Sequence, residues 1–372
     1  MSKTPKLRFP EFNSEWKTYS LGNVVEFYDN KRKPVKEQER TSGPYAYYGA
    51  TGIIDYINDF IFEGEYLLLG EDGANIVTRN APLVYKTSGK FWVNNHAHIF
   101  KPKDDFNIDF LKYYLELINY IPYNTGTAQP KLNAESVKII PVKAPNIKEQ
   151  ERIASLFLLV DKKIEKQKKK VETLQEYKKG IMQKIFLQKV RFKDEDGESY
   201  PKWEVKILGD ICSINKGEQL NKLDLLSNGE YYALNGGIEP SGYTENWNTK
   251  ENTISISEGG ASCGYVKFNV KKFWSGGHCY TLEGLSKSIY NEYLYQYLKF
   301  YEPSIMALRV GSGLPNIQKS ALTGFKVSIP AIEEQQKIAD ILFQIEEKIY
   351  KEQKKLEQLK KFKKGLLQKM FV

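Results

Sequence analysis

The chain has 372 residues, of which 41% are hydrophobic and 13% aromatic, and its formal net charge is +9. This length is too great for one ordinary domain and the composition excludes a disordered chain, so we expect two domains, each with its own core. The longest aliphatic run, residues 156–160, is far too short to cross a bilayer, which predicts a soluble, cytoplasmic protein with no membrane partner.

The sequence offers little for catalysis or metal binding. Its three cysteines lack CxxC spacing, which disfavours a disulfide framework or zinc site and favours buried thiols. No phosphate loop, HExxH, GxSxG or amino-methyltransferase motif is present. Acid–base chemistry would have to rest on carboxylates such as Glu71 and Asp72, for which turn formation is the better interpretation. We therefore expect no catalytic residue, cofactor-binding residue or metal ligand in this chain.

Two globular segments, 1–147 and 190–332, have the pattern of α+β domains. Short strands are predicted within 45–56, 60–69, 75–85 and 253–266, where β-branched and aromatic residues lie between Gly and Asn turns. A short helix is predicted to follow in each domain, over 110–118 in the first and 290–301 in the second. Each domain is therefore expected to contain an irregular sheet with helices beside it.

Two long helices are predicted, over 148–189 and 333–372, and they hold the excess charge. The first has 12 Lys/Arg against 6 Asp/Glu and the second 10 against 7, so together they account for the whole net charge. Their apolar residues recur at spacings of three and four, which indicates a heptad seam. The seam positions are Ile153, Phe157, Val160, Ile164, Val171, Leu174 and Ile181 in the first helix and Ile338, Leu342, Ile345, Ile349, Leu356, Leu359 and Leu366 in the second.

Polar residues interrupt both seams at matching points, Gln167 and Lys178 in the first helix and Glu352 and Lys363 in the second. Such positions cost stability but can fix register and partner choice. Because a globular domain separates the helices in sequence, the pattern predicts an antiparallel coiled coil with pseudo-twofold symmetry. The alternative is a pair of ordinary charged helices on the domain surfaces.

The second half of the chain repeats the first. Residues 149–186 align with 334–371 without a gap, and nearly half of the aligned residues are identical. The similarity continues more weakly into the globular segments, where Trp16 matches Trp203 and His96 matches His278. The two halves therefore share the helices and the matching positions of the globular segments, whereas the interiors of the domains diverge.

Polar loops in both domains carry side chains that can bond phosphates or read base edges. For any one of these residues a solvated loop is the simpler interpretation. The candidate DNA-binding residues are Lys31, Arg32, Lys33, Asn75, Arg79, Asn80, Asn124, Thr125, Gln129 and Lys131 in the first domain, and Lys216, Gln219, Asn221, Lys222, Ser262, Arg309, Ser312 and Asn316 in the second.

This layout resembles the specificity subunit of type I restriction-modification systems. The most specific marks are the Pro-x-Ile-x-Glu-Gln motif at each helix start, residues 145–150 and 330–335, and the paired Gln-Lys-x-Phe endings of the helices. Residues 48–54 and 70–74 are similar to stretches of the family's target recognition domains, whereas the second half departs from them at 234–238 and 257–261. The resemblance covers the whole chain, and this departure favours an asymmetric target.

The resemblance implies that each domain reads one half of a bipartite site in double-stranded DNA, while the helices set the spacer. A helix of about 38 residues is roughly 57 Å long, which corresponds to half-site centres at most about fifteen base pairs apart. It also implies that the helices dock two DNA adenine methyltransferase subunits and that restriction/translocase subunits join the complex. S-adenosylmethionine, ATP and Mg would then belong to those partners.

Two other interpretations stay open at this point. The chain could be a scaffold whose helices recruit partners without reading DNA, or an enzyme with an unrecognised carboxylate site. Sequence-selective, salt-dependent DNA binding would separate the first of these from a DNA-reading subunit. The absence of catalytic motifs weighs against the second.

Overall fold

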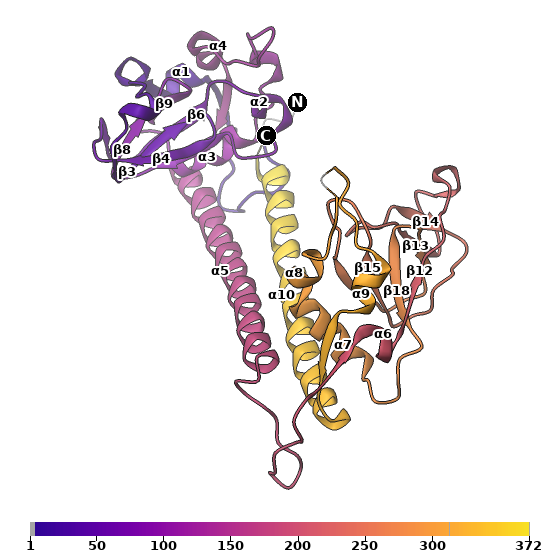
Figure 1. The fold of residues 1–372 in the computed structure, drawn as a ribbon. Helices are drawn as coiled ribbons and strands as arrows, with labels where there is room; N and C mark the ends of the chain where they lie inside the picture. Colours follow the sequence, from indigo (N-terminus) through magenta and orange to yellow (C-terminus); the bar gives the residue numbers. More distant parts are fainter. Residues whose placement is uncertain (1–3, 312, 372) are drawn as a thin grey trace. The chain divides into compact units, whose positions relative to one another are not determined.

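The computed structural model describes residues 4–311 and 313–371, without the side chain of Lys222. The chain forms two compact units, residues 1–168 with 354–372 and residues 169–353. Each unit contains one α+β domain and segments of both long helices, α5 (Ile147–Phe186) and α10 (Ile332–Met370) (Figure 1). The two helices begin and end within three residues of the expected bounds.

The first domain contains two four-stranded sheets and a two-stranded ribbon. One sheet has the order β2-β9-β6-β7 and the other β4-β3-β8-β5, while β1 pairs with β10. The strands are β1 (Lys17–Ser20), β2 (Val25–Phe27), β3 (Ser42–Gly49), β4 (Gly52–Ile57), β5 (Phe62–Glu63), β6 (Tyr66–Gly70), β7 (Val84–Thr87), β8 (Lys90–Val93), β9 (Ala97–Pro102) and β10 (Pro141–Ala144). The helices are α1 (Leu21–Val24), α2 (Asn75–Thr78), α3 (Ile108–Leu117) and α4 (Ala134–Lys138), with 3-10 turns at 29–31, 37–39 and 121–123.

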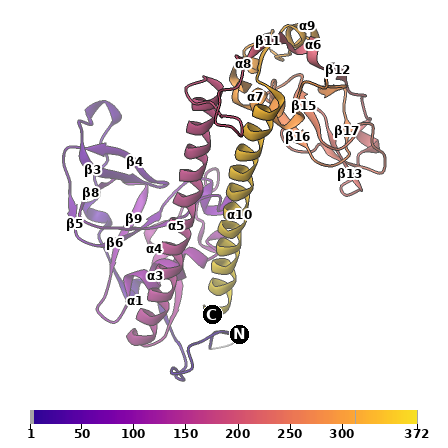
Figure 2. The same ribbon diagram turned by 90° about the horizontal axis from the view of Figure 1, so that it is seen from below.

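The second domain (Figure 2) repeats this topology, except that its second sheet has three strands where the first domain has four. Its sheets have the orders β12-β18-β15-β16 and β14-β13-β17, and β11 pairs with β19. The strands are β11 (Glu204–Ile207), β12 (Ser213–Lys216), β13 (Tyr231–Leu234), β14 (Gly242–Thr244), β15 (Thr253–Ser257), β16 (Val266–Asn269), β17 (Trp274–Ser275), β18 (Cys279–Glu283) and β19 (Lys326–Ile329). The helices are α6 (Leu208–Ile211), α7 (Asn291–Phe300), α8 (Glu302–Met306) and α9 (Lys319–Thr323), with a 3-10 turn at 222–224. Even the parallel pair is repeated, because β3 pairs with β8 as β13 pairs with β17.

One expected strand is wrong in its first half. Residues 75–78 form the short helix α2, and only β7 at the end of the 75–85 stretch is extended. The side-chain amide of Asn75 donates to the carbonyls of Ala81 and Pro82 and accepts from the Ala81 amide, while Arg79 adopts a left-handed conformation. These local bonds compete with a strand and fold the segment into a loop.

Each domain core includes residues of both long helices. Ile153 and Phe157 of α5 and Met370 of α10 lie in the first core. Ile185 of α5 and Ile338 of α10 lie in the second, together with Leu342. All fourteen seam positions expected from the heptad pattern are buried or half-buried.

The start of each long helix is fixed by a buried glutamate. Glu149 accepts from Arg8 Nε and Nη2, both at 2.7 Å, and from Trp16 Nε1 at 3.3 Å. Glu334 accepts from Arg191 Nη2 at 2.6 Å and from Trp203 Nε1 at 3.1 Å. Both carboxylate side chains have no exposed surface, and each has an arginine beside it as a counter-ion.

The glutamine that follows ties the helix to a neighbouring loop in both domains. Gln150 Nε2 donates to the carbonyl of Pro145 at 2.9 Å, and its Oε1 accepts from the Asn107 amide at 3.0 Å. Gln335 makes the matching bonds to Pro330 and Tyr290, at 2.9 and 2.8 Å. The Glu-Gln pair that marks the repeat in sequence is therefore the joint between domain and helix.

We expect Glu149→Ala to destabilise the first unit by about 3 kcal/mol, because it leaves the Arg8 guanidinium without its buried partner. Hydrogen exchange measured by mass spectrometry should quicken in β1 and β10 and stay unchanged in β11 and β19. Glu334→Ala should give the reverse pattern. Glu151→Ala, which removes an exposed carboxylate two residues further along α5, serves as the control, and equal exchange in Glu149→Ala and this control would contradict the anchoring role.

Candidate nucleic-acid interface

The loop at residues 29–33 carries three of the residues that were expected to contact DNA, and the environments of their side chains differ. Lys31 is exposed, with its ammonium 5.1 Å from the centre of the Tyr28 ring. Lys33 is exposed as well, and its carbonyl accepts from the Trp92 indole. Arg32 instead is half-buried, and its guanidinium lies 2.6 Å from Glu71 Oε2. Two of the three cations therefore face solvent while the third binds within the domain.

Residues around α2 hold their own loop. Arg79 Nη2 donates to the carbonyl of Glu116 at 2.6 Å and to its Oε1 at 2.8 Å, and the other oxygen of Glu116 accepts from the amides of Leu83 and Val84. Asn75 donates a hydrogen bond to the Ala81 carbonyl in the same loop, whereas Asn80 is exposed. The structure thus gives Arg79 and Asn75 a role in shaping the loop.

The loop at 124–131 is closed by its own polar side chains. Asn124 Oδ1 accepts from the amides of Gly126 and Lys131, at 3.1 and 2.8 Å, and Thr125 Oγ1 donates to the Lys131 carbonyl at 3.1 Å. Gln129 is exposed at the turn. Lys131 reaches back from this loop, with its ammonium 3.3 Å from Glu71 Oε1.

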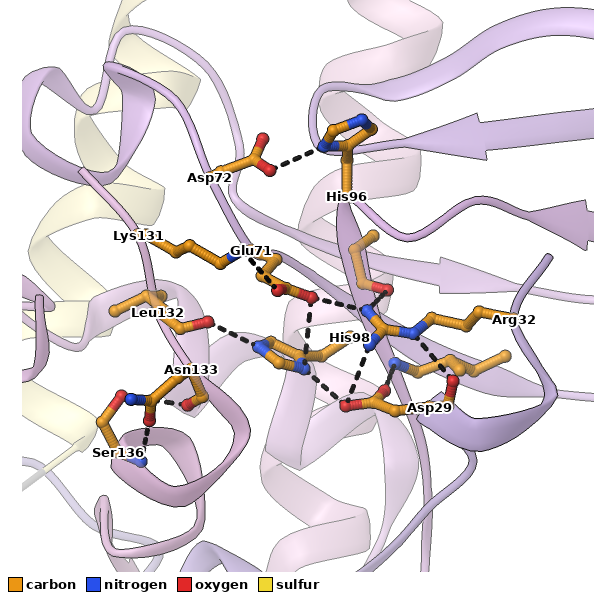
Figure 3. A network of polar contacts seen from close by, with 12 residues as sticks. Asp29, Arg32, Glu71, Asp72, His96, His98, Lys131, Leu132, Asn133 and Ser136 are labelled. Atoms are coloured by element: carbon orange, nitrogen blue, oxygen red, sulfur yellow. Dashed lines mark hydrogen bonds and ion pairs between the residues drawn. The ribbon is translucent and has the colours of Figure 1, made fainter. Parts of the chain in front are cut away.

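Arg32 and Lys131 therefore meet at one buried carboxylate, in a polar cluster that also contains Asp29 and His98 (Figure 3). His98 is buried in β9 and contacts Asp29 Oδ2 at 2.6 Å and the Leu132 carbonyl at 2.8 Å. The cluster joins the 29–33 loop, β9 and the 124–131 loop. Sequence reasoning selected the two cations but weighed Glu71 only as an acid–base group or, in preference, as a turn residue, and it missed Asp29 and His98.

The charge state of the cluster follows from its hydrogen bonds. Burial alone would raise the pKa of Asp29, but the hydrogen bond and charge of His98, the Ile99 amide and nearby Arg32 together hold it below its ordinary value. Asp29 is therefore ionised at neutral pH, and both its carboxylate and the Leu132 carbonyl can only accept. The two ring nitrogens of His98 lie beside these two acceptors, one on each side of the imidazole. Arg32 thus lies beside both carboxylates, and Lys131 lies beside that of Glu71.

The second domain repeats this arrangement with other residues. Glu258, buried after β15, accepts from Lys216 Nζ at 2.7 Å and from the Tyr280 hydroxyl at 3.0 Å. His278 Nδ1 lies 3.5 Å from its other oxygen. Asn316 is half-buried and pairs through its backbone with Val310 and Gly259. Lys216 is thus, like Arg32 and Lys131 in the first domain, a cation bound to a buried carboxylate.

The remaining candidates of the second domain lie in loops. Gln219, Asn221 and Arg309 are exposed, and Ser262 is half-buried. Gln219 Nε2 donates to the neighbouring Leu220 carbonyl at 3.0 Å. Ser312 and the side chain of Lys222 lie outside the described residues. Nothing in the contacts brings these four described residues to the Glu258 carboxylate.

The described part of the chain holds no group of three or more His, Cys, Asp or Glu side chains placed to bind a metal ion. The three cysteines, Cys212, Cys263 and Cys279, are buried and form no disulfide. No helix within residues 4–311 and 313–371 is long and apolar enough to cross a membrane.

Comparison with known proteins points to one family. The sequence model of the type I restriction modification DNA specificity domain matches residues 13–175 and again 200–361. A Haemophilus influenzae relative that carries the name of a type I restriction enzyme specificity subunit is 27% identical over 368 residues, which cover 89% of this chain and 87% of the relative. The type I restriction enzyme MjaVIII specificity subunit of Methanocaldococcus jannaschii is 24% identical, covering 97% and 92% of the two chains.

A solved structure shares the fold. The crystal structure of the type I restriction-modification S subunit from M. genitalium superposes with a TM-score of 0.74 at 20% identity, and the alignment covers 99% of both chains. The two matches to the family model coincide with the two repeats, and together they span most of the sequence. The chain therefore belongs to the DNA specificity subunits of type I restriction-modification systems and carries two specificity domains in tandem.

Proposed function

We propose that each of the two domains reads one half of a bipartite, asymmetric DNA target and that the chain itself catalyses no reaction. The observation that carries this proposal is the repeated strand order with different polar residues at matching places. Arg32 and Lys131 surround Glu71 in the first domain, whereas Lys216 approaches Glu258 in the second. Because base recognition depends on which donors are presented, the two domains would read different half-sites.

The long helices are proposed to pack as an antiparallel coiled coil with pseudo-twofold symmetry. In the first unit Asp161 of α5 binds Lys363 of α10 at 2.5 Å, and in the second Lys178 of α5 binds Glu346 of α10. These are matching pairs in the repeat, with the roles of the helices exchanged. In the second unit Lys170 also binds Glu352. The α5 residue with the lower residue number thus binds the α10 residue with the higher one, which is the order of an antiparallel pair.

The polar seam positions give this packing its register. Lys178, Lys363 and Glu352 are three of the four residues that interrupt the apolar seams, and each of them forms an ion pair between α5 and α10. A shifted register would separate these charges from their partners within an otherwise apolar seam. We infer that the helices act as a ruler, which sets the spacer between half-sites.

The outer faces of the helices are proposed to dock two DNA adenine methyltransferase subunits, with restriction/translocase subunits joining the complex. Tyr177 of α5 and Phe362 of α10 support this, because they are matching positions in the repeat and both side chains are 56% exposed. Two equivalent surfaces suit two copies of one partner. S-adenosylmethionine, ATP and Mg would bind to these partners, and the complex would act in the cytoplasm.

We expect the chain, assembled with its methyltransferase subunits, to bind duplex DNA with sequence selectivity and steep salt dependence. Affinity should fall by about 10³-fold or more between 50 and 200 mM salt if six or more phosphates are neutralised. In the double variant Lys31→Gln/Lys33→Gln, the slope of log affinity against log salt should become shallower by about two. Filter binding or fluorescence anisotropy over a salt series measures this.

Lys103→Gln, at an exposed site outside the polar loops, is the control and should leave the slope unchanged. Binding that shows no sequence preference, or no dependence on salt, would favour the scaffold interpretation. Unchanged slope in the double variant would mean that the 29–33 loop does not face DNA.

The ruler role can be tested by lengthening both helices together. Seven residues inserted beside Gln167 and seven beside Glu352 keep the heptad phase and add roughly 10 Å to each helix. The spacer should then grow by about three base pairs, at 3.4 Å per pair, while both half-sites stay the same. A methylation map of cells expressing this variant reads out the spacer, and an unchanged spacer would contradict the proposal.

A further inference from the structure

One feature of the divergent domain interiors is repeated: a buried glutamate directly after the third strand in the orders β2-β9-β6-β7 and β12-β18-β15-β16. Glu71 follows β6 and is 8% exposed, and Glu258 follows β15 and is 3% exposed. The two residues match in the repeat, although the loops around them differ in sequence. An isolated carboxylate in such a place is costly, so its retention in both domains calls for a role.

The backbone around the two glutamates is the same. The Glu71 amide donates to the His96 carbonyl at 2.9 Å, and the Glu258 amide donates to the His278 carbonyl at 2.9 Å. The Glu71 carbonyl accepts from the Leu132 amide at 2.7 Å, as the Glu258 carbonyl does from Ile317 at 2.8 Å. Both side chains therefore start from an equivalent, fixed position between two chain segments.

The turn beyond each glutamate is also repeated. Gly73 and Gly260 have φ values of 106° and 77°, which favour glycine, and their amides donate to the carbonyls of Pro130 and Pro315 at 3.0 Å. These bonds hold the turn against the segment that carries Lys131 in the first domain and Asn316 in the second. The shared frame thus extends to the segment that presents Lys131 in the first domain.

The two domains differ in the cations that bind to the glutamate. Glu71 binds Arg32 with one oxygen and Lys131 with the other, and these cations come from separate loops. Glu258 binds Lys216 with one oxygen. The Lys131 and Lys216 side chains are 52% and 53% exposed, so each rests on a buried acid while its surface stays open to solvent.

We propose that Glu71 and Glu258 are positioning residues for base recognition, each holding the cations of its own domain in the orientation that suits its half-site. This inference rests on the proposed DNA-reading function. A lysine on a flexible stem loses rotamer freedom when it binds a base, and a fixed ion pair removes part of that cost beforehand. The glutamate also neutralises its cations in the absence of DNA, which limits their attraction to phosphates of any sequence.

This role predicts opposite effects on selectivity and on general affinity. Glu71→Gln keeps the shape but frees Arg32 and Lys131 from their carboxylate. Affinity for unrelated DNA should rise, and the slope of log affinity against log salt should steepen by about one to two. Discrimination between correct and altered first half-sites should fall about tenfold, while discrimination at the second half-site stays unchanged. Damage to the fold alone would lower affinity and make the slope shallower.

The test uses the full chain assembled with its methyltransferase subunits and a library of duplexes with a randomised segment, from which bound DNA is sequenced at several salt concentrations. Glu258→Gln is the matched variant and should relax only the second half-site. Glu63→Gln removes the same charge from an exposed site of β5 and should change neither selectivity nor salt slope.

Lys131→Gln provides a second variant that cannot be confused with unfolding, because this side chain is half-exposed. It should weaken discrimination at the first half-site and make the salt slope shallower by about one. If the wild type selects a bipartite sequence but Glu71→Gln and Lys131→Gln keep full discrimination and the same slope, the positioning role is wrong. If the wild type itself selects no sequence, the proposed DNA-reading function fails instead.

Discussion

The fold of each unit depends on one buried ion pair at the start of its long helix. Glu149 and Glu334 are enclosed by an arginine and a tryptophan from the segment that opens each domain. Breaking such a pair would leave a buried charge without its counter-ion, which proteins tolerate poorly. The rest of each domain can vary only in ways that keep the helix start in place. This applies to the two-stranded ribbons, to the bonds of Gln150 and Gln335 and to the domain cores. This accounts for the similarity of the two helix entrances in the repeat.

The repeat made the architecture predictable from sequence. The heptad pattern predicted both long helices to within a few residues, and the fourteen apolar seam positions are all buried or half-buried. The segment at 75–85 was predicted less well, because its conformation depends on the side-chain bonds of Asn75 within the loop and on a distant partner of Arg79. Arg79 binds Glu116, which is 37 residues away, and local residue preferences carry no information about that contact. The shared sheet order of the two domains was also hidden, since their strands have diverged.

In the candidate interface, too, contacts between residues far apart in the sequence could not be predicted from residue type. Residue type identified Arg32, Lys131 and Lys216 as cations able to contact DNA, but it did not reveal that each rests on a buried glutamate. The one available signal was the alignment of Glu71 with Glu258 between otherwise different loops. Internal acids therefore divide the basic residues into those that are fixed within the domain and those, such as Lys31 and Lys33, that stay in solvent. Composition alone cannot make this division, because it depends on contacts between distant parts of the chain.

The central claim is that this chain selects the DNA site for its partner subunits. Single-molecule methylation mapping tests it most directly, by comparing cells that express the methyltransferase subunits with this chain and cells that express them without it. The account predicts a bipartite adenine-methylated motif, with two different half-sites, only in the presence of the chain. The same motif in cells lacking the chain would contradict the account, because the site would then be chosen elsewhere.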